Sequence, residues 1–304
     1  MTKGNILIVG VLDKKGSTNI SQAKSFMRFG WNVIPINYRT IIANYGYGTF
    51  ENTLMYAVEK YRPSLVMFCK CNGVNPELVK RVTQRTKTWL WNPDPIQTIE
   101  RCMEVVEHAK NATYSSCTGY GVAKWFAEQG VKNCYHIFDG LDYDIFKPVE
   151  PDESYRAEIS FIGTRTAERD RFIDFLKAIG YDIKTYGQGY GKVVIDDEFA
   201  KVCCSSKFML SINTYNDIEC YFSNRLLRYM GCGACVLHYD PTETLKKVFD
   251  DGSEILFFKD ESELQDKLKI KDPWKIGLNG MNKVLSSLTW DHTIANILNI
   301  TGLL

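Results

Sequence analysis

Two arginines, Arg225 and Arg228, lie three residues apart in the segment 220–240, CYFSNRLLRYMGCGACVLHYD. At about 100° per residue they fall on one side of a helix with Tyr229, opposite the leucines. Ser223 is suited to cap this helix, which puts Arg225 in the first turn beside free backbone N–H groups. The Gly-Cys-Gly turn that follows lets the helix pack closely on the next strand. The pattern therefore predicts an anion site for a phosphorylated ligand beside the end of a strand.

A second pair of arginines follows the apolar run of FIGTRTAERDR. Arg165 and Arg169 lie at the start of a predicted helix, where a cation opposes the helix dipole. That arrangement is understandable if they face a diphosphate, which arginine binds bidentately. In the alternative interpretation Glu168 and Asp170 pair with them on a solvated face. We favour an anion-binding role for one of the two arginines.

The first predicted strand ends in the loop GVLDKKGSTN, which carries lysines and hydroxyls before a helix N-terminus. Its N–H groups could hold a phosphate or a hydroxyl-rich ligand, and a plain strand-to-helix turn is an equally good interpretation. The loop has neither the GxGxxG pattern nor a Walker A motif. Asp13 in this loop and Asp94, fixed between two prolines, are candidates for a general base. Both are also ordinary turn residues.

Metal-binding patterns are weak in this chain. Asp142 and Asp144 form a DxD pair, which could hold a divalent ion on a sugar nucleotide, but the irregular sequence around them favours a turn. The ten cysteines are irregularly spaced and the four histidines are scattered singly, so no zinc pattern emerges. We expect reduced, mostly buried cysteines and no metal.

The elements that must position these residues alternate between apolar strands and helices, which is typical of a parallel sheet. In the first half, helices are predicted at 16–30, 49–63, 75–85, 95–109 and 119–130, between strands at 5–12, 31–38, 64–70, 86–92, 111–117 and 133–140. The segment 139–154 breaks this rhythm with two prolines and many acidic residues, and we interpret it as a linker.

The alternation then resumes. Strands are predicted at 157–163, 181–187, 207–213, 234–239 and 253–258, and helices at 169–180, 197–206, 223–231, 243–252, 260–269, 274–288 and 289–300. The chain thus predicts two doubly wound, Rossmann-like α/β domains at 1–148 and 149–285, with a C-terminal helical segment, 286–304, packing back toward the first. Ligands of such sheets bind beyond the carboxyl ends of the strands, so we expect a cleft faced by both domains.

Composition excludes several classes of protein. With 304 residues, 45% hydrophobic content and a formal net charge of +1, the chain lacks the excess basic charge of a general nucleic-acid binder. No apolar run approaches the roughly 20 residues of a membrane span. The first apolar run is too short for a signal peptide and is interpreted as a strand. We expect a soluble, cytoplasmic protein.

Taken together, the motifs resemble the GT-B glycosyltransferases, in particular the branch of CgeB-type and group 1 transferases. The resemblance spans nearly the whole chain and rests on the segments CKCNGVNPELV, WLWNPDP, DGLDYDIFKP, ISFIGTRTAERDRFIDFL, FSNRLLRYMGCGACVLHYD and DDGSEILFFKDESEL. It implies a nucleotide-sugar donor bound mainly by the second domain, an acceptor bound by the first, and no required metal or other cofactor.

One departure from this family concerns the helix before the Gly turn. The family usually has a glutamate there that holds the donor ribose, whereas this sequence has Arg228, and Cys220 where an earlier glutamate often stands. Arg225 matches an arginine of the CgeB-like branch. The resemblance therefore implies a retained diphosphate contact and an altered recognition of ribose or sugar.

The sequence thus predicts metal-independent sugar transfer from a nucleotide sugar, with a UDP-sugar the expected donor. The acceptor is left open: a glycan, a protein, a small molecule or, as the only nucleic acid, a modified DNA base. Asp94 or Asp13 would be the base of an inverting enzyme; a retaining enzyme would need neither in that role. The alternatives are a nucleotide-sugar epimerase and a non-catalytic nucleotide-sugar-binding subunit.

Two groups of residues are predicted to bind the substrates. The donor group consists of Gly163, Arg165, Arg169, Tyr186, Gly187, Asn213, Asn224, Arg225 and Arg228. The acceptor group consists of Lys15, Ser17, Thr18, Lys70 and Asn72.

Overall fold

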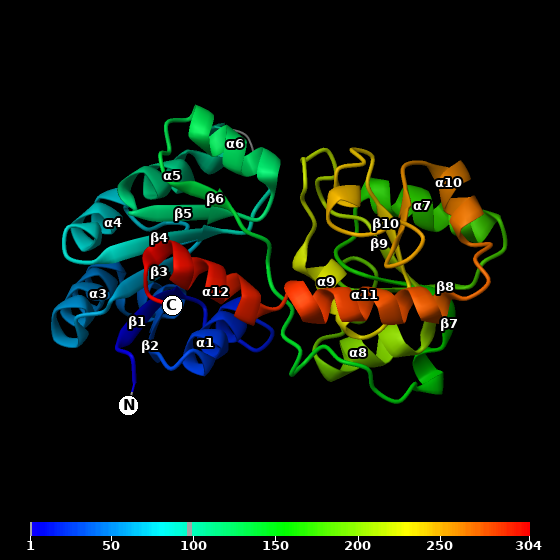
Figure 1. Ribbon diagram of the computed structural model, residues 1–304, viewed down its shortest axis with the longest axis horizontal. Helices are drawn as coiled ribbons and strands as arrows, with labels where there is room; N and C mark the ends of the chain where they lie inside the picture. Colours follow the sequence, from blue (N-terminus) through cyan, green and yellow to red (C-terminus); the bar gives the residue numbers. More distant parts are fainter. Residues whose placement is uncertain (1, 96–98) are drawn as a thin grey trace. The chain divides into compact units, whose positions relative to one another are not determined.

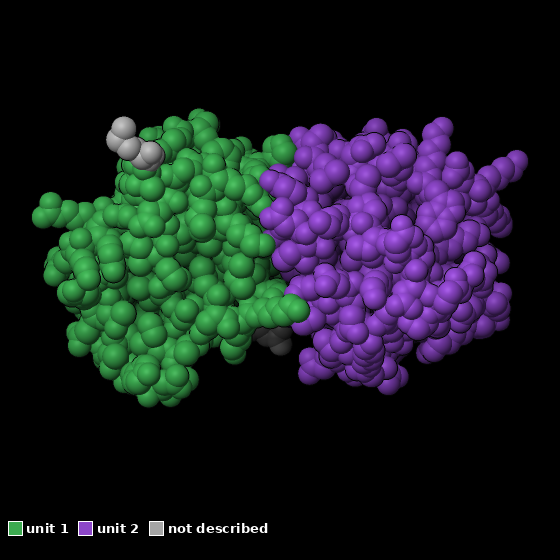
Figure 2. Space-filling model, turned by 90° about the horizontal axis from the view of Figure 1, so that it is seen from below, with its two compact units in different colours: residues 1–138, 290–304 green, residues 139–289 purple. Residues whose placement is uncertain are grey.

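The computed structural model describes residues 2–95 and 99–304 and divides the chain into two compact units. Unit 1 comprises Met1–Phe138 and Trp290–Leu304, and unit 2 comprises Asp139–Thr289 (Figure 2). Each unit is built on a parallel sheet of its own (Figure 1). The division inferred from sequence, between residues 148 and 149, falls inside unit 2.

Unit 1 contains a six-stranded sheet in the order β2-β1-β3-β4-β5-β6, and every neighbouring pair is parallel. Its central strands β1 and β3 are buried along almost their whole length, as continuous apolar runs in a parallel sheet should be. The strands are β1 (Asn5–Gly10), β2 (Asn32–Asn37), β3 (Leu65–Cys69), β4 (Lys87–Asn92), β5 (Tyr114–Cys117) and β6 (Cys134–His136). All six predicted strands of this half are confirmed.

The helices of unit 1 are α1 (Thr18–Arg28), α2 (Tyr38–Tyr45), α3 (Tyr47–Tyr61), α4 (Pro76–Thr83), α5 (Ile99–Asn111), α6 (Tyr120–Glu128) and α12 (Trp290–Thr301). α1 and α12 lie side by side (Figure 1) and share one core with the sheet, to which α12 contributes Trp290, Ile294, Ile297 and Leu298. The short helix α2 was not predicted; no side-chain cap marks its start. Residues 96–98, in the first turn of the helix predicted at 95–109, lie outside the described residues.

Unit 2 contains a five-stranded parallel sheet in the order β11-β10-β9-β7-β8. The strands are β7 (Ala157–Ile162), β8 (Ile183–Tyr186), β9 (Ser206–Ser211), β10 (Val236–Tyr239) and β11 (Leu256–Phe258). The helices are α7 (Ala167–Ala178), α8 (Asp197–Cys204), α9 (Asn224–Gly231), α10 (Glu261–Lys267) and α11 (Pro273–Ser287), with 3₁₀ turns η1 (Glu153–Tyr155) and η2 (Leu245–Lys247).

The helix predicted at 243–252 is wrong, because only the 3₁₀ turn η2 forms there. Asp240 explains the difference: its carboxylate accepts hydrogen bonds from the Thr242 hydroxyl and the Leu245 N–H, which fixes a local turn instead of a helix start.

The segment interpreted as a linker is an ordered part of unit 2. Asp142 Oδ1 accepts a hydrogen bond from the Asp144 N–H, and the Asp142 carbonyl accepts from the N–H groups of Ile145 and Phe146. The turn interpretation of the DxD pair is therefore confirmed. Leu141 and Phe146 are buried, so this segment packs against the rest of unit 2.

Both sheets have the strand order 2-1-3-4-5 when strands are numbered along each unit, with a sixth strand added in unit 1. The order reverses between β1 and β3 in unit 1 and between β7 and β9 in unit 2. At such a reversal the connections leave to opposite faces, which opens a crevice at the carboxyl ends of the strands.

Candidate anion site at the strand ends of unit 2

Two arginines meet at the crevice between β7 and β9. Arg169 comes from α7 and Arg225 from α9, and both donate to the carbonyl oxygen of Ile212, just beyond β9, at 3.0 and 2.5 Å. Both guanidinium groups also lie over the ring of Phe161, at 5.3 and 5.1 Å from its centroid. One carbonyl and one aromatic ring thus hold two cations together.

This pair carries uncompensated positive charge. Neither Arg169 nor Arg225 makes a salt bridge with any carboxylate that the structure describes. Burial, and secondarily the charge of Arg225, lowers the pKa of Arg169 to about 10. The two guanidinium groups repel each other because they share one carbonyl acceptor. The arrangement therefore favours an anion that neutralises both charges.

Two polar atoms beside the pair are buried without a hydrogen-bond partner among the described residues, Arg225 Nε and Ser223 Oγ. Leaving a buried donor unpaired costs about 1–3 kcal/mol, and more for a charged group. Both atoms lie at the N-terminus of α9, where the first backbone N–H groups of a helix lack intrahelical acceptors. An anion at this point would satisfy the unpaired donors as well as the charge.

The local sequence builds this helix start in two ways. Ser223 is the N-cap of α9, as predicted, yet its hydroxyl makes no capping bond. Instead its N–H donates to Asn213 Oδ1 at 3.1 Å, which ties the helix to the end of β9. Asn224 donates its side-chain amide to the Gly140 carbonyl at 2.9 Å, fastening the first turn to the preceding segment of unit 2.

Arg165 lies apart from the buried pair. It is mostly exposed and pairs with Asp170 at 2.8 Å, while the Tyr190 hydroxyl donates to the other oxygen of the same carboxylate. The hydrogen bond from Arg165 lowers the pKa of Asp170. Glu168 does not pair with either arginine; it accepts from the Asn216 side chain. The two arginines of this segment thus have different environments.

Two glycines allow the backbone to come close to the arginines. A Cβ on Gly163 would lie 2.5 Å from Arg225 Nη1, and one on Gly187 would lie 2.4 Å from the Gly163 carbonyl oxygen. Gly187 also has φ +113°, which side chains rarely tolerate. The neighbouring Tyr186 is buried and its ring packs near that of Tyr155.

Arg228 is engaged within the unit. Its Nε donates to Asn224 Oδ1 at 2.8 Å, and its guanidinium lies 4.6 Å from the centroid of the Phe146 ring. Burial lowers the pKa of Arg228, opposed by the carboxylates of Asp139, Asp196 and Asp142. Its acidic neighbours therefore come from the segment before β7 and the start of α8.

Tyr229 lies near the arginine pair, as the helical projection predicted, since its hydroxyl interacts electrostatically with Arg225 and Arg169. Tyr229 is fully buried, its hydroxyl hydrogen-bonds to both the N–H and the carbonyl of Ile162, and its ring stacks on Phe199. The arginine side of α9 is therefore largely buried as well, and the helix is covered on most of its circumference.

His238 of β10 is a fully buried polar residue close enough to Arg225 to feel its charge. Its Nδ1 lies 2.9 Å from Ser211 Oγ, and its Nε2 has no partner among the described residues. Burial, with a smaller contribution from the charge of Arg225, lowers the pKa of His238 to about 3. The imidazole is therefore neutral at ordinary pH and adds no charge to the site.

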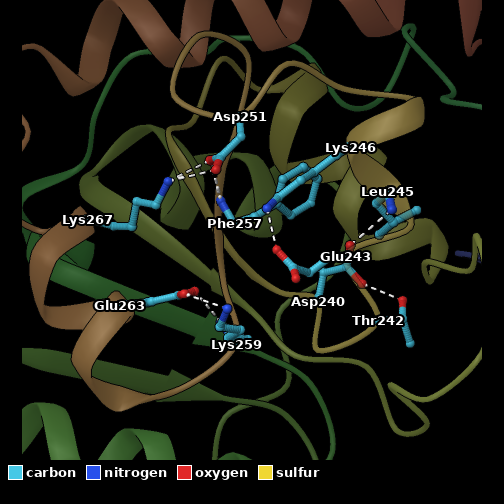
Figure 3. Close-up of polar contacts among 10 residues, drawn as sticks. All are labelled: Asp240, Thr242, Glu243, Leu245, Lys246, Asp251, Phe257, Lys259, Glu263 and Lys267. Carbon is cyan, nitrogen blue, oxygen red and sulfur yellow. Dashed lines mark hydrogen bonds and ion pairs between the residues drawn. The ribbon is translucent and has the colours of Figure 1, made fainter.

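The outer end of the same sheet, beyond β10 and β11, provides a contrast (Figure 3). A cavity of about 270 Å³ there is lined by several carboxylates and three lysines. The lysines are already paired: Lys267 with Asp251 at 2.8 Å, Lys259 with Glu263 at 3.2 Å, and Lys246 with Glu243 at 2.5 Å. Because each lysine of this cavity is already paired with a carboxylate, the cavity attracts a diphosphate less strongly than the arginine pair does.

In unit 1, Lys70 and Asp94 form an ion pair of 2.7 Å at the ends of β3 and β4. Lys70 and Cys71 both have φ +60°, an uncommon conformation for residues with side chains, which tends to occur at functional sites. Asp13 lies in another loop and accepts a hydrogen bond from the Thr40 hydroxyl at 2.5 Å. The two candidate bases therefore have different partners.

The remaining acceptor candidates surround the start of α1 and the loop after β3. Ser17 caps α1, accepting from the Asn19 N–H, and donates to the Val11 carbonyl at 2.5 Å. Thr18 opens α1, and Lys15 and Asn72 are exposed. Sequence reasoning missed two asparagines that hold this loop: Asn19 Oδ1 accepts from Val11 N–H and Asn37 Oδ1 from Leu12 N–H, both at 2.8 Å. For Asn37, an asparagine at the end of an apolar strand was the available signal.

The described residues contain neither a metal-binding cluster nor a membrane-spanning helix. Within 2–95 and 99–304, no group of three or more His, Cys, Asp or Glu side chains is arranged to hold a metal ion. In the same residues, no helix combines the length and apolar character needed to cross a bilayer.

Comparison with known proteins supports glycosyl transfer. Residues 165–299, which include α7, α9 and the arginine pair, match the protein family described as glycosyl transferase-like. Sucrose-phosphate synthase from Thermosynechococcus elongatus has a similar structure, with a TM-score of 0.65 and 14% identity, over 98% of both chains. A glycosyltransferase from Rickettsia africae ESF-5 matches with a TM-score of 0.62 and 11% identity, over 99% of this chain and 98% of that one.

A third similar structure is the pneumococcal O-GlcNAc transferase GtfA in complex with UDP and GlcNAc, with a TM-score of 0.55 and 11% identity, over 84% of this chain and 59% of that one. No curated protein gave a significant match. The fold is that of the GT-B glycosyltransferases, and residues 165–299 form a glycosyltransferase-like domain.

Proposed function

We propose that this glycosyltransferase takes its sugar from a nucleotide donor whose diphosphate binds to Arg169, Arg225 and the start of α9. The observation that carries the proposal is the pairing of two arginines, on one carbonyl and without a carboxylate, at the strand-order reversal of unit 2. A diphosphate supplies the two to three negative charges and the acceptor oxygens that such a pair favours.

The two arginines have different tasks in this proposal. Arg169 already donates to the carbonyls of Ile212 and Thr164 and to Thr214 Oγ1, so it holds the strand ends together and contributes charge. Arg225 retains an unpaired Nε, and Ser223 an unpaired hydroxyl. Arg225 and the first turn of α9 therefore make the direct contacts, as phosphates commonly do at helix N-termini.

The same groups would assist the chemistry. When the bond between sugar and diphosphate breaks, negative charge grows on the leaving oxygen. Preoriented cations and N–H groups in a site shielded from water stabilise that charge without reorganising. Because the arginines supply this stabilisation, we propose that transfer requires no divalent metal.

The acceptor is assigned to unit 1 in this proposal, with Lys15, Ser17, Thr18, Lys70 and Asn72 as its candidate contacts. Asp94 is the better placed base, since its ion pair with Lys70 fixes the carboxylate at the end of β4. In an inverting reaction one of its oxygens would take the proton of the acceptor hydroxyl. Asp13 is the second candidate.

Two further points refine the donor. The UDP in the similar pneumococcal transferase motivates a UDP-sugar as the first donor to test. Arg225 is the residue that supports a finer assignment to the CgeB-like branch. Arg228 is packed on Phe146 and bonded to Asn224, so it would shape the donor site through the position of Asn224.

The direct test is thermal unfolding with UDP, GDP, ADP, CDP and dTDP, each with and without EDTA. A nucleotide present at 100 times its dissociation constant should stabilise the protein by about 2.7 kcal/mol. We expect UDP to give the largest shift and EDTA to leave it unchanged. If none of the five nucleotides alters the melting temperature, the donor site is misassigned.

A second measurement follows sugar release from UDP-glucose and UDP-GlcNAc over long incubations. A glycosyltransferase without its acceptor is expected to hydrolyse its donor slowly to UDP and free sugar. Conversion of UDP-GlcNAc into an epimer, or tight binding with no turnover of any donor, would contradict transfer as the activity.

A further inference from the structure

Unit 2 has a second cavity, at the opposite end of its sheet from the arginines. We call it the amino-end cavity, because it lies where β7 and β9 begin and where the chain enters β8. Its volume is about 800 Å³, within the range of sites that bind small molecules. It is lined by Pro151, Asp152, Glu153, Arg156, Ala157, Glu158, Asp182, Cys204, Ser205, Ser206, Lys207, Lys271, Pro273 and Trp274.

The charges of this lining nearly cancel. Four lining side chains are acidic and three are basic, so the wall offers both hydrogen-bond acceptors and donors without a strong net sign. A diphosphate or another polyanion would find no excess positive charge here, in contrast to the arginine pair. The chemistry favours an uncharged ligand that both donates and accepts hydrogen bonds.

Some of these groups are already engaged and others are not. Asp152 caps η1, Glu153 pairs with Arg156, and Glu158 accepts from the Asp182 N–H. By contrast, Lys207 and Lys271 make no hydrogen bond or ion pair within the described residues. Two donors at the cavity wall are therefore available to a ligand.

An exposed indole adjoins the free lysines. Trp274, in the first turn of α11, exposes 57% of its surface, and its ring and N–H have no partner among residues 2–95 and 99–304. The indole thus gives the wall of the cavity a large, flat apolar surface beside its charged groups. Its electron-rich face attracts C–H groups that carry partial positive charge.

We propose that the amino-end cavity binds an uncharged oligosaccharide. A pyranose ring presents a face of C–H groups, which suits the Trp274 indole, and a rim of hydroxyls that donate to carboxylates and accept from ammonium groups. Trp274 stacks on one sugar ring, Lys271 and Lys207 donate to its hydroxyls, and Asp182 accepts. An oligosaccharide thus uses the indole, the two lysines and the balanced charge together.

This site is separate from the donor site. The two lie at opposite ends of β7, whose six residues at about 3.3 Å each put roughly 20 Å between them. Glycan binding here would tether the enzyme to a polymer without competing for the nucleotide. Glycan binding at this cavity can therefore be tested independently of nucleotide binding at the arginine pair.

The test titrates maltohexaose, cellohexaose and chitohexaose into the full chain, following calorimetric heat, with hexagalacturonate as the acidic comparison. At least one neutral hexasaccharide should bind, and saturating UDP should leave its dissociation constant unchanged. Trp274→Ala should weaken that binding at least tenfold, and Lys271→Ala severalfold. Both side chains are exposed, so the variants should melt at the wild-type temperature.

The matched control is Leu278→Ala, one turn further along α11, where a 52% exposed side chain does not line the cavity. This variant should bind sugar as the wild type does. Equal losses in Trp274→Ala and Leu278→Ala would mean that the helix face, not the cavity, makes the contact. Absence of binding by every neutral sugar at millimolar concentration, or preference for hexagalacturonate, would overturn the proposal.

Discussion

At the scale of single residues, the donor site depends on charges left unpaired. In unit 2, Arg156, Arg165 and Arg171 are paired with carboxylates, whereas Arg169 and Arg225 share a carbonyl. Exposed ion pairs contribute little to stability, and their partners screen them from a ligand. Binding should therefore respond to the loss of Arg225 and not to the loss of a paired arginine.

Arg225→Ala should weaken UDP binding about tenfold to a hundredfold, because a hydrogen bond to a charged group is worth roughly 1.5–3 kcal/mol. Arg171→Ala, which removes an arginine paired with Glu261, should leave the affinity unchanged. Isothermal titration calorimetry with UDP compares the two. Indistinguishable dissociation constants would show that Arg225 does not contact the nucleotide.

His238 gives a pH dependence with a definite sign. Below its ordinary pKa of 6.5 the unfolded chain binds a proton that the folded protein does not bind until about pH 3. Stability therefore falls as the pH drops through this window, by about 2 kcal/mol between pH 7 and pH 5 from this group alone.

His238→Gln should remove that part of the loss, whereas His292→Gln, at an exposed position of α12, should not. Urea unfolding at pH 7 and pH 5 measures both. Parallel losses in the wild type and His238→Gln would show that the imidazole is not kept neutral by the fold.

At the scale of elements, the turn after β7 determines where Arg225 can lie. Gly163→Ala would bring a methyl group 2.5 Å from Arg225 Nη1 and 2.9 Å from the Phe161 ring, so the guanidinium must move. We expect UDP affinity to fall about tenfold, the loss of one charged hydrogen bond, with a smaller effect on melting temperature.

Gly48→Ala in α3 meets no atom within 4 Å and serves as the control, expected to be neutral or slightly stabilising. Calorimetric titration with UDP reports the affinity and thermal unfolding reports the stability of each variant. Unchanged affinity in Gly163→Ala would mean that the nucleotide tolerates a displaced Arg225.

The elements themselves were largely predictable, because β1 and β3 are continuous apolar runs and glycines or prolines punctuate the chain between them. Local sequence patterns were less informative about the site, because contacts between residues far apart in the sequence determine its geometry. The Ile212 carbonyl that joins Arg169 to Arg225 is a backbone atom, so no side-chain pattern could reveal it. The partner of Tyr229 was hidden for a related reason: Ile162 lies 67 positions away in the sequence.

At the scale of the whole molecule, unit 2 is a continuous stretch inserted into unit 1, which is completed by α12. Each unit has its own core, one centred on Phe208 and Phe172 and the other including Ile297 and Trp290. Units with separate cores are expected to unfold in separate transitions.

Calorimetric unfolding should therefore resolve two transitions, of which UDP raises only that of unit 2. Ile297→Ala should lower the UDP-insensitive transition, at a cost of about 2–5 kcal/mol, and Phe208→Ala the UDP-sensitive one, at about 3–5 kcal/mol. A single transition lowered by both substitutions would show that the units unfold as one.

The insertion also has a consequence for the order in which the protein matures during translation. When residue 138 leaves the ribosome, the sheet of unit 1 is complete in sequence but the helix that covers it beside α1 has not been made. At about 5–20 residues per second, roughly ten to thirty seconds pass before residues 290–304 follow. During this interval the nascent unit 1 exposes the surface that Trp290, Ile294 and Ile297 later bury, while unit 2 folds first. The half of the chain synthesised first is thus the half that finishes last and most needs a chaperone.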